Sequence, residues 1–142
     1  MKWLLAVALS MFMITGTADH EVPVFHSVQE LNCLALNIHH EASGESKLGK
    51  IAVANVTINR TKSNKFPSTI CAVVKQPRQF SWVGVKHHSI KKIPAETYQL
   101  AIDILDGKYK DVTRGALYFH NATVESFNRR FTVKIGQHLF YS

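Results

Sequence analysis

One short segment joins an apolar helical pattern to a group of ionisable side chains. The string LALNIHHEASGES, residues 34–46, places Glu41 directly after His39 and His40 and just before a Ser-Gly break. Consecutive residues on a helix point about 100° apart, so these three side chains cannot converge on a metal as the i, i+4 histidines of an H-E-x-x-H helix do. The segment therefore offers a single carboxyl group.

The rest of the chain gives little support to other catalytic chemistries. It contains no G-x-S-x-G elbow and no phosphate-cradling glycine pattern. His87 and His88 lie in the basic stretch VKHHSIKK, which is expected to be a solvated loop. No second group of histidine and acidic residues has ligand spacing, so we expect neither a metal nor a cofactor.

The chemistry that remains is that of an acid. Cys33, Asn37 and Glu41 follow one another at four-residue steps, which places Glu41 on a helix flank at the border of the core. Partial burial disfavours the charged form and raises the pKa of a carboxyl group, as the general acid of glycoside cleavage requires. Spacing alone leaves open an ordinary surface glutamate paired with a polar neighbour. Glu45, beyond Gly44, is expected to be exposed and either solvated or structural.

Two helices are predicted to position this acid. Ser27 and Glu30 form a capping box that begins a helix near Val28, and Gly44 ends it. Its inward positions are Leu31, Leu34, Ala35, Ile38 and Ala42. A second helix begins at Ser46, with inward positions Leu48, Ile51, Ala52, Asn55 and Asn59. Buried amides must be hydrogen-bonded, so the two asparagines are expected to hold neighbouring loops and helix ends.

The remaining segments predict an α+β domain that is mainly helical with a small C-terminal antiparallel sheet. FPSTICAVVKQ indicates a short helix with Pro67 in its first turn and with Ile70, Val73 and Val74 inward. PAETYQLAIDILDG indicates a helix from Pro94 to a stop at Gly107. Its expected buried face consists of Tyr98, Ala101, Ile102 and Leu105. GALYFHN and FTVKIGQHLFYS are typical of strands.

The two cysteines, Cys33 and Cys71, predict one disulfide if the chain matures in an oxidising compartment. The bond would close a loop of about 38 residues, which the chain-entropy model values at roughly 4 kcal/mol. It would clamp the third helix to the first and steady the helix that carries Glu41. Two independent buried thiols are the alternative.

Residues 1–18 have the pattern of a secretory signal peptide. Lys2 precedes an apolar run from Trp3 to Ile14, and Gly16 and Ala18 occupy the −3 and −1 positions. A retained anchor is the alternative, although the run is short against the roughly 20 residues that span a bilayer. Residues 19–142 would then form one exported domain, a monomer with no stable membrane insertion, in the periplasm or outside the cell. Its 16 basic and 10 acidic residues suit a polyanionic surface such as wall polymer, anionic lipid or nucleic acid.

Several separated blocks resemble one known family. HHEASGE, GKIAVANVTINRTKS, FPSTICAVVKQPRQFSW, GALYFHN and KIGQHLFY, in this order, look like the SleB/CwlJ-type cell wall hydrolase family, from about Cys33 to Tyr141. The resemblance implies a lysozyme-like catalytic domain related to lytic transglycosylases. It also implies an essential glutamate at Glu41 and peptidoglycan strands, with no nucleic acid, as the partner. The sugar groove would be lined by Gln79, Phe80, Ser81, Tyr118, His120 and Asn121, each with packing or loop hydrogen bonding as the alternative.

The expected activity is an exported peptidoglycan glycosidase that cleaves the β-1,4 bond between N-acetylmuramic acid and N-acetylglucosamine. Glu41 would protonate the bridging oxygen and then deprotonate the muramyl 6-hydroxyl, which closes an anhydro ring without a second carboxylate. A hydrolytic muramidase normally uses a partner carboxylate, and none of the available acids lies in a recognisable motif: Asp103, Asp106, Asp111 and Glu125. A zinc-dependent peptidoglycan amidase or peptidase and a non-catalytic wall-binding module are the other classes.

Overall fold

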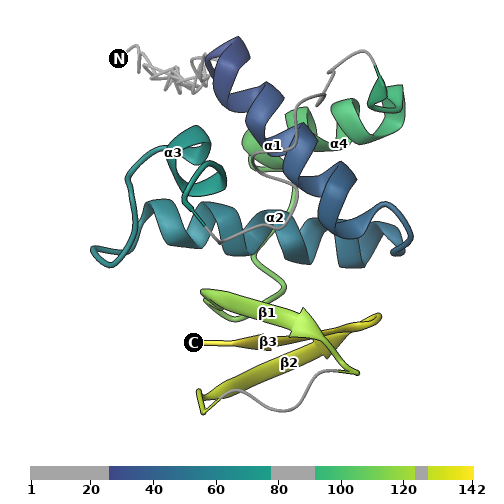
Figure 1. Cartoon of the computed structure of the whole chain (residues 1–142). Helices are drawn as coiled ribbons and strands as arrows, with labels where there is room; N and C mark the ends of the chain where they lie inside the picture. The colour runs from purple at the N-terminus through teal and green to yellow at the C-terminus, as the bar shows by residue number, and fades with distance from the viewer. Residues whose placement is uncertain (1–25, 78–91, 124–127) are drawn as a thin grey trace, which may run out of the picture.

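The computed structural model describes residues 26–77, 92–123 and 128–142. These ranges contain helices followed by a three-stranded sheet (Figure 1). The helices are α1 (Val28–Ala42), α2 (Lys47–Thr61), α3 (Ile70–Val74) and α4 (Ala95–Leu105), and the strands are β1 (Tyr118–Asn121), β2 (Phe131–Ile135) and β3 (His138–Tyr141). The predicted α+β architecture is confirmed. The expected signal peptide lies outside the described residues.

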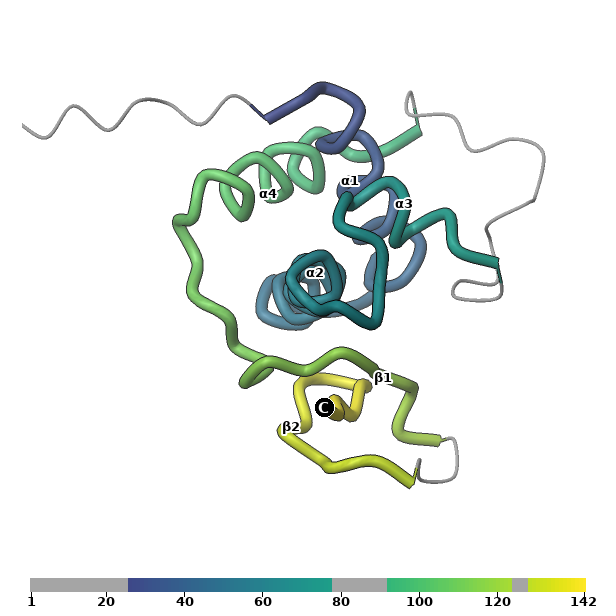
Figure 2. Tube along the Cα trace, turned by 90° about the vertical axis from the view of Figure 1, so that its left-hand side faces the viewer, coloured from purple at the N-terminus to yellow at the C-terminus, as the bar shows by residue number. Residues whose placement is uncertain are grey.

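Helix α2 is the centre of the molecule. The other helices lie on one side of it and the sheet lies on the other, as both views show (Figures 1 and 2). The larger apolar cluster joins α1, α3 and α4 to α2. The smaller one joins Ala52 and Val56 of α2 to Phe140 and Ile135 of the sheet. A helix buried on both sides explains why Ala and Val dominate the middle of α2.

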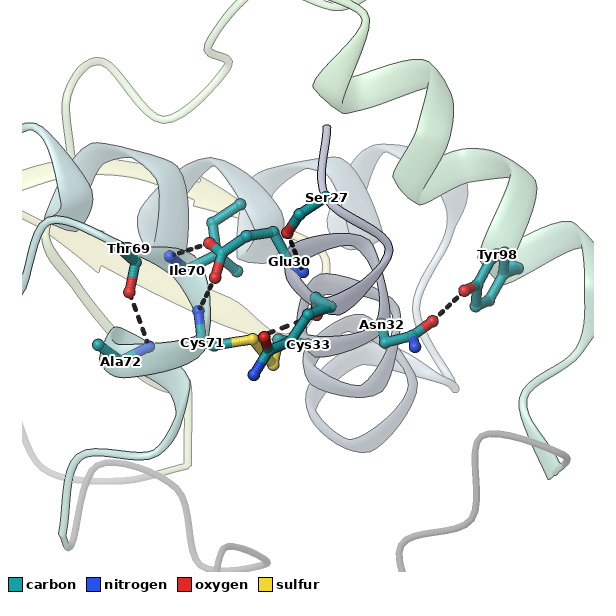
Figure 3. Close-up of a disulfide and its surroundings, with 10 residues drawn as sticks. Ser27, Glu30, Asn32, Cys33, Thr69, Ile70, Cys71, Ala72 and Tyr98 are labelled. Carbon is teal, nitrogen blue, oxygen red and sulfur yellow. Dashed lines mark hydrogen bonds between the residues drawn. A yellow bond between two sulfur atoms is a disulfide. The ribbon is translucent and has the colours of Figure 1, made fainter. Parts of the chain in front are cut away.

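The start of α1 is where the capping pattern predicts it. The Ser27 hydroxyl accepts a hydrogen bond from the backbone N–H of Glu30, and the helix begins at Val28. The Glu30 carboxylate does not complete the capping box. It accepts hydrogen bonds from the backbone N–H groups of Ile70 and Cys71, at 2.6 and 3.3 Å, and so satisfies the first turn of α3 (Figure 3).

A disulfide joins Cys33 of α1 to Cys71 of α3, with Cα atoms 5.2 Å apart (Figure 3). The prediction of one bond is confirmed, and the alternative of two thiols is wrong. In the same region the hydroxyl of Tyr98 donates a hydrogen bond to Asn32 and ties α4 to α1. Helix α1 is therefore held by a covalent bond to α3 and by a hydrogen bond to α4.

Three sequence predictions need correction. Leu48 is 50% exposed, because periodicity gives the face of a helix but not where its packing partners end. Helix α3 begins at Ile70 after the N-cap Thr69, so Pro67 precedes the helix and does not lie in its first turn. The buried residues of α4 are Thr97, Leu100, Ala101 and Ile104, so the packed face is rotated away from Ile102.

The sheet has the strand order β1-β3-β2, and both pairs are antiparallel. Gly136 adopts φ +57° in the tight turn between β2 and β3, a conformation that favours glycine. The central strand β3 buries Phe140 and Tyr141. None of the helices in the described ranges is both long enough and apolar enough to cross a bilayer.

Candidate active site

Glu41 lies in the last turn of α1 and is half-buried, as its spacing predicts. One turn earlier, the fully buried Asn37 accepts a hydrogen bond of 2.7 Å from the hydroxyl of Thr57 in α2. This buried polar contact fixes α1 against α2 next to the acid. Together with the disulfide two turns earlier, it determines where the Glu41 side chain leaves the helix.

A buried cation interacts electrostatically with Glu41. Arg60, near the end of α2, is only 5% exposed, and its Nε donates a hydrogen bond of 2.7 Å to the carbonyl oxygen of Leu117. Burial lowers the pKa of Arg60 to about 10, while its interactions with Tyr118 and Glu41 act in the opposite direction. The guanidinium therefore remains charged at neutral pH. By reciprocity, its positive charge stabilises the ionised form of Glu41.

Tyr118 of β1 is the centre of an aromatic and basic group, which we name the Tyr118 cluster: Arg60, Phe66, Tyr118 and Arg129. The Phe66 and Tyr118 ring centroids are 5.8 Å apart. The Arg60 guanidinium lies 4.9 Å from the Phe66 centroid and 5.8 Å from that of Tyr118. The Arg129 guanidinium lies 3.5 Å from the Tyr118 centroid. Rings and guanidinium groups of this kind suit the flat faces and anionic groups of a polysaccharide.

His120 and Asn121 make their observed contacts within the end of the sheet. His120 Nδ1 lies 2.7 Å from the carbonyl oxygen of Asn121, which can only accept, so Nδ1 carries the proton. Nε2 forms a hydrogen bond of 2.9 Å with the Tyr141 hydroxyl. The Asn121 side-chain oxygen accepts from the backbone N–H and the hydroxyl of Thr123. Sugar binding by these two residues stays a prediction.

Glu45 is structural. Its side chain is about 10% exposed, and its carboxylate accepts hydrogen bonds from the backbone N–H of Gln137. His138 Nδ1 lies 3.8 Å from the same carboxylate. The expectation of a solvated side chain is therefore wrong, and that of a structural one is confirmed. Glu45 fastens the β2–β3 turn to the loop that precedes α2.

The close approach of this turn requires glycine. A Cβ atom on Gly136 would lie 1.9 Å from Glu45 Oε2. His138 beside it is mostly buried, and desolvation lowers its pKa, an effect that His120 reinforces and Glu45 opposes. The contact therefore combines a carboxylate with a histidine that burial keeps neutral.

The predicted amide contacts and the other described acids are occupied by the structure itself. Asn55 accepts from the backbone N–H of Val112, and Asn59 donates to Asp111, Thr113 and Ala116, which confirms that both asparagines hold a loop. Burial alone would raise the pKa of Asp111, but hydrogen bonds from Thr113, Asn59 and Gly115 hold it below its usual value.

The two acids near α4 also have partners. Asp103 accepts from Gln99 and Lys108, and Asp106 lies 4.0 Å from a ring nitrogen of His26. Glu125 lies outside the described residues. Within the described ranges, no three histidine, cysteine or acidic side chains come together as a metal would require.

The structure thus brings together part of the predicted site. Tyr118 and Glu41 both interact electrostatically with Arg60, whereas Gln79, Phe80 and Ser81 lie outside the described residues. Sequence reasoning missed Arg60, Phe66 and Arg129. Arginine is rarely buried, so the pattern of α2 gave no reason to place Arg60 inside. The signal that was present is its position in NVTINRT, one of the blocks that carry the family resemblance.

Comparison with known proteins gives the same family. The model of the Cell Wall Hydrolase family matches residues 44–141, beginning three residues after Glu41. A spore cortex-lytic enzyme of Bacillus cereus is 35% identical over 124 residues, which are 84% of this chain and 46% of that protein. One of Halalkalibacterium halodurans is 32% identical over 84% of this chain and 36% of that protein. The chain therefore spans less than half the length of these curated relatives.

Two solved structures are similar over their full length. The catalytic domain of the germination-specific lytic transglycosylase SleB from Bacillus anthracis has a TM-score of 0.71 at 33% identity, covering 85% of this chain and 100% of that one. The catalytic domain of Bacillus cereus SleB has a TM-score of 0.70 at 32% identity, covering 89% and 100%. The family match, the relatives and the shared fold agree that the chain belongs to the cell wall hydrolase family of enzymes.

Proposed function

We propose that this chain is an exported lytic transglycosylase that cleaves the β-1,4 bond between N-acetylmuramic acid and N-acetylglucosamine in peptidoglycan. The observation that carries the proposal is the setting of Glu41. It is half-buried beside the charged Arg60, while Asp103, Asp106 and Asp111 are engaged in contacts of their own. Partial burial favours the protonated form that donates, and the charge of Arg60 favours the carboxylate that then accepts, so the two opposing influences suit a residue that is acid and then base.

The steps follow from proton balance. Glu41 gives its proton to the bridging oxygen, the glycosidic bond breaks, and the N-acetylglucosamine chain leaves with a free hydroxyl. The muramyl ring carries the positive charge, and the Glu41 carboxylate now present is stabilised by Arg60. Glu41 then takes the proton of the muramyl 6-hydroxyl as that oxygen bonds to C1. The product is a 1,6-anhydro end, and Glu41 regains its proton.

The similar proteins support the proposed reaction. One structural neighbour is named a lytic transglycosylase, and the curated relatives are named spore cortex-lytic enzymes. Because the chain spans less than half of those relatives, the proposal takes from these names only the lytic reaction and leaves the spore role aside. The disulfide supports export, since such bonds persist in oxidising compartments. Cleavage after Ala18 would give a mature protein that begins at Asp19, which N-terminal sequencing of the exported protein tests.

Digestion of isolated sacculi tests the activity. We expect the protein to release muropeptides with anhydro ends in mass spectra. Glu41→Gln should abolish release, a loss of at least about a hundredfold, with unchanged thermal unfolding, because it removes the proton that is transferred. A chelator should have no effect.

Each alternative has its own product in the same assay. Products with free reducing ends would show that the protein is a hydrolytic muramidase and not a transglycosylase. Cleaved stem peptides would indicate a zinc-dependent amidase or peptidase. That activity would be lost with a chelator and would remain in the Glu41→Gln variant. Binding to sacculi without any release would indicate a wall-binding module.

A further inference from the structure

We propose that Arg129 is a binding residue for carboxylates of the peptide stems, so that the enzyme prefers glycan strands whose stems carry free acids. The inference rests on the proposed function and names a substrate feature of the same site. Its basis is the position of Arg129 in the Tyr118 cluster. The guanidinium lies over the Tyr118 ring, while the residue as a whole is exposed.

The ring contact prepares this side chain for binding. An arginine normally loses rotamer freedom when it binds, but a guanidinium already stacked on a ring has lost part of it beforehand. The Arg129 Cζ atom lies 3.5 Å from the ring centroid, too close for the group to approach edge-on, so the guanidinium must lie roughly face-on to the ring. Its N–H groups lie in the plane of the guanidinium, so stacking leaves them available for the two oxygens of a carboxylate.

The surrounding charge also favours an anion. Tyr118 has two guanidinium groups near its ring, with Arg60 at 5.8 Å and Arg129 at 3.5 Å. From residue 114 onward the sequence has four basic residues and one acidic residue, Glu125, which the structure does not describe. Among the described residues from 114 onward there is thus no acidic side chain, and the acid that interacts with the cluster, Glu41 of α1, does so through Arg60. A carboxylate from the substrate would reduce the repulsion between the two cations.

The place of Arg129 relative to the acid makes a stem the fitting ligand. Arg60 interacts electrostatically with both Tyr118 and Glu41, so the cluster adjoins the catalytic carboxyl. The stem peptide is attached to the muramyl sugar, on which Glu41 is proposed to act. Peptide stems contain carboxylates, whereas the sugars of a stem-bearing strand carry only uncharged groups, namely hydroxyl, acetamido and the amide-linked lactyl ether. Arg129 would therefore read the substituent of the strand while Glu41 acts on its backbone.

The test changes only the charge of the ligand. Defined glycan strands with free stem carboxylates are compared with the same strands after conversion of those carboxylates to amides. For the wild-type protein we expect amidation to raise KM about three- to tenfold with little change in kcat. Arg129→Gln should show the raised KM on both strands and should not discriminate between them. Arg129→Lys should keep part of the preference for the free-acid strand. Arg130→Gln is the matched control, since Arg130 is also exposed and basic, and should behave as wild type.

Binding gives a second readout that does not depend on turnover. The Glu41→Gln protein, titrated with both strands, should bind the free-acid strand more tightly by the same factor. The proposal is overturned if Arg129→Gln still discriminates as wild type does, or if Arg130→Gln loses discrimination equally, which would indicate a general charge effect. A wild-type protein that cleaves neither strand would instead overturn the proposed function, and this inference with it.

Discussion

The helical part of the molecule and the C-terminal sheet are held in different ways. In the helical part, α1 is fixed by the Cys33–Cys71 disulfide and a large apolar cluster. The sheet is attached to α2 by a small apolar cluster and by polar contacts from Arg60 and Glu45. The acid belongs to the firmly held part and Tyr118 to the other. The geometry of the candidate site therefore depends on the weaker of the two attachments.

The helical part and the C-terminal sheet also differ in the charges of their side chains. Glu41 and the other described acids lie in the helices, in the loop before α2 and in the segment that leads to β1, whereas the strands and the segment before β2 contain Lys and Arg but no described acid. Arg60 connects the two, since it bonds to Leu117 just before β1 and interacts with Glu41. The proposed acid and the proposed anion-binding residue thus lie on separate elements, which can be altered independently.

The largest expected effect comes from the disulfide in the helical part. Replacing both cysteines, Cys33→Ala with Cys71→Ala, should lower the free energy of unfolding by roughly 4 kcal/mol, because the bond closes a loop across a sequence separation of 38. Urea denaturation of the variant and of the wild-type protein measures the loss. The same measurement on reduced wild-type protein is the control and should give a similar value. A loss below about 1 kcal/mol would show that packing alone holds α1.

The contrast also explains what the sequence could predict. The start of α1 and the strands depend on local patterns, namely Ser27 with Glu30 and the alternating C-terminal runs, so both were predictable. The disulfide was predictable because the chain has only two cysteines. Glu45 bonds to Gln137 across 92 residues, and periodicity contains no information about such a partner. The buried charge of Arg60 likewise depends on rings from two other segments.

The sheet attachment can be weakened at Gly136. Gly136→Ala should lower the free energy of unfolding by about 2 kcal/mol, because alanine is strained at positive φ and its Cβ would displace the Glu45 carboxylate. Gly107→Ala is a matched control with φ +75° and no atom within 4 Å of the added Cβ, so it reports backbone strain alone. We expect the control to lose about 1 kcal/mol and to keep full activity.

The difference between the two glycine variants isolates the Glu45 contact. Activity on sacculi should fall in Gly136→Ala and not in Gly107→Ala, since only the former moves the sheet that carries Tyr118. Equal losses of stability in thermal or urea unfolding would mean that Glu45 can shift without cost. The contact between Glu45 and the β2–β3 turn would then not be what holds the sheet, and the comparison between a firmly held and a weakly held part would fail.

The smallest expected effect is a pH dependence of stability that comes from His138, next to the contact between Glu45 and the β2–β3 turn. The pKa of His138 in the folded protein is lowered from 6.5 by desolvation, so the unfolded chain takes up this proton at higher pH than the folded one. Stability must therefore fall as pH drops through about 6.5 toward the folded value, and be flat with respect to this group above it. Glu45 and His120 face the ring, and their opposite influences leave the lowered pKa in place. His138→Gln should remove part of the slope of unfolding free energy between about pH 7 and 5, measured as the difference from wild type because other histidines titrate in the same range. An identical slope in both proteins would mean that His138 becomes protonated without loosening the sheet, and that the Glu45 pair compensates fully for burial.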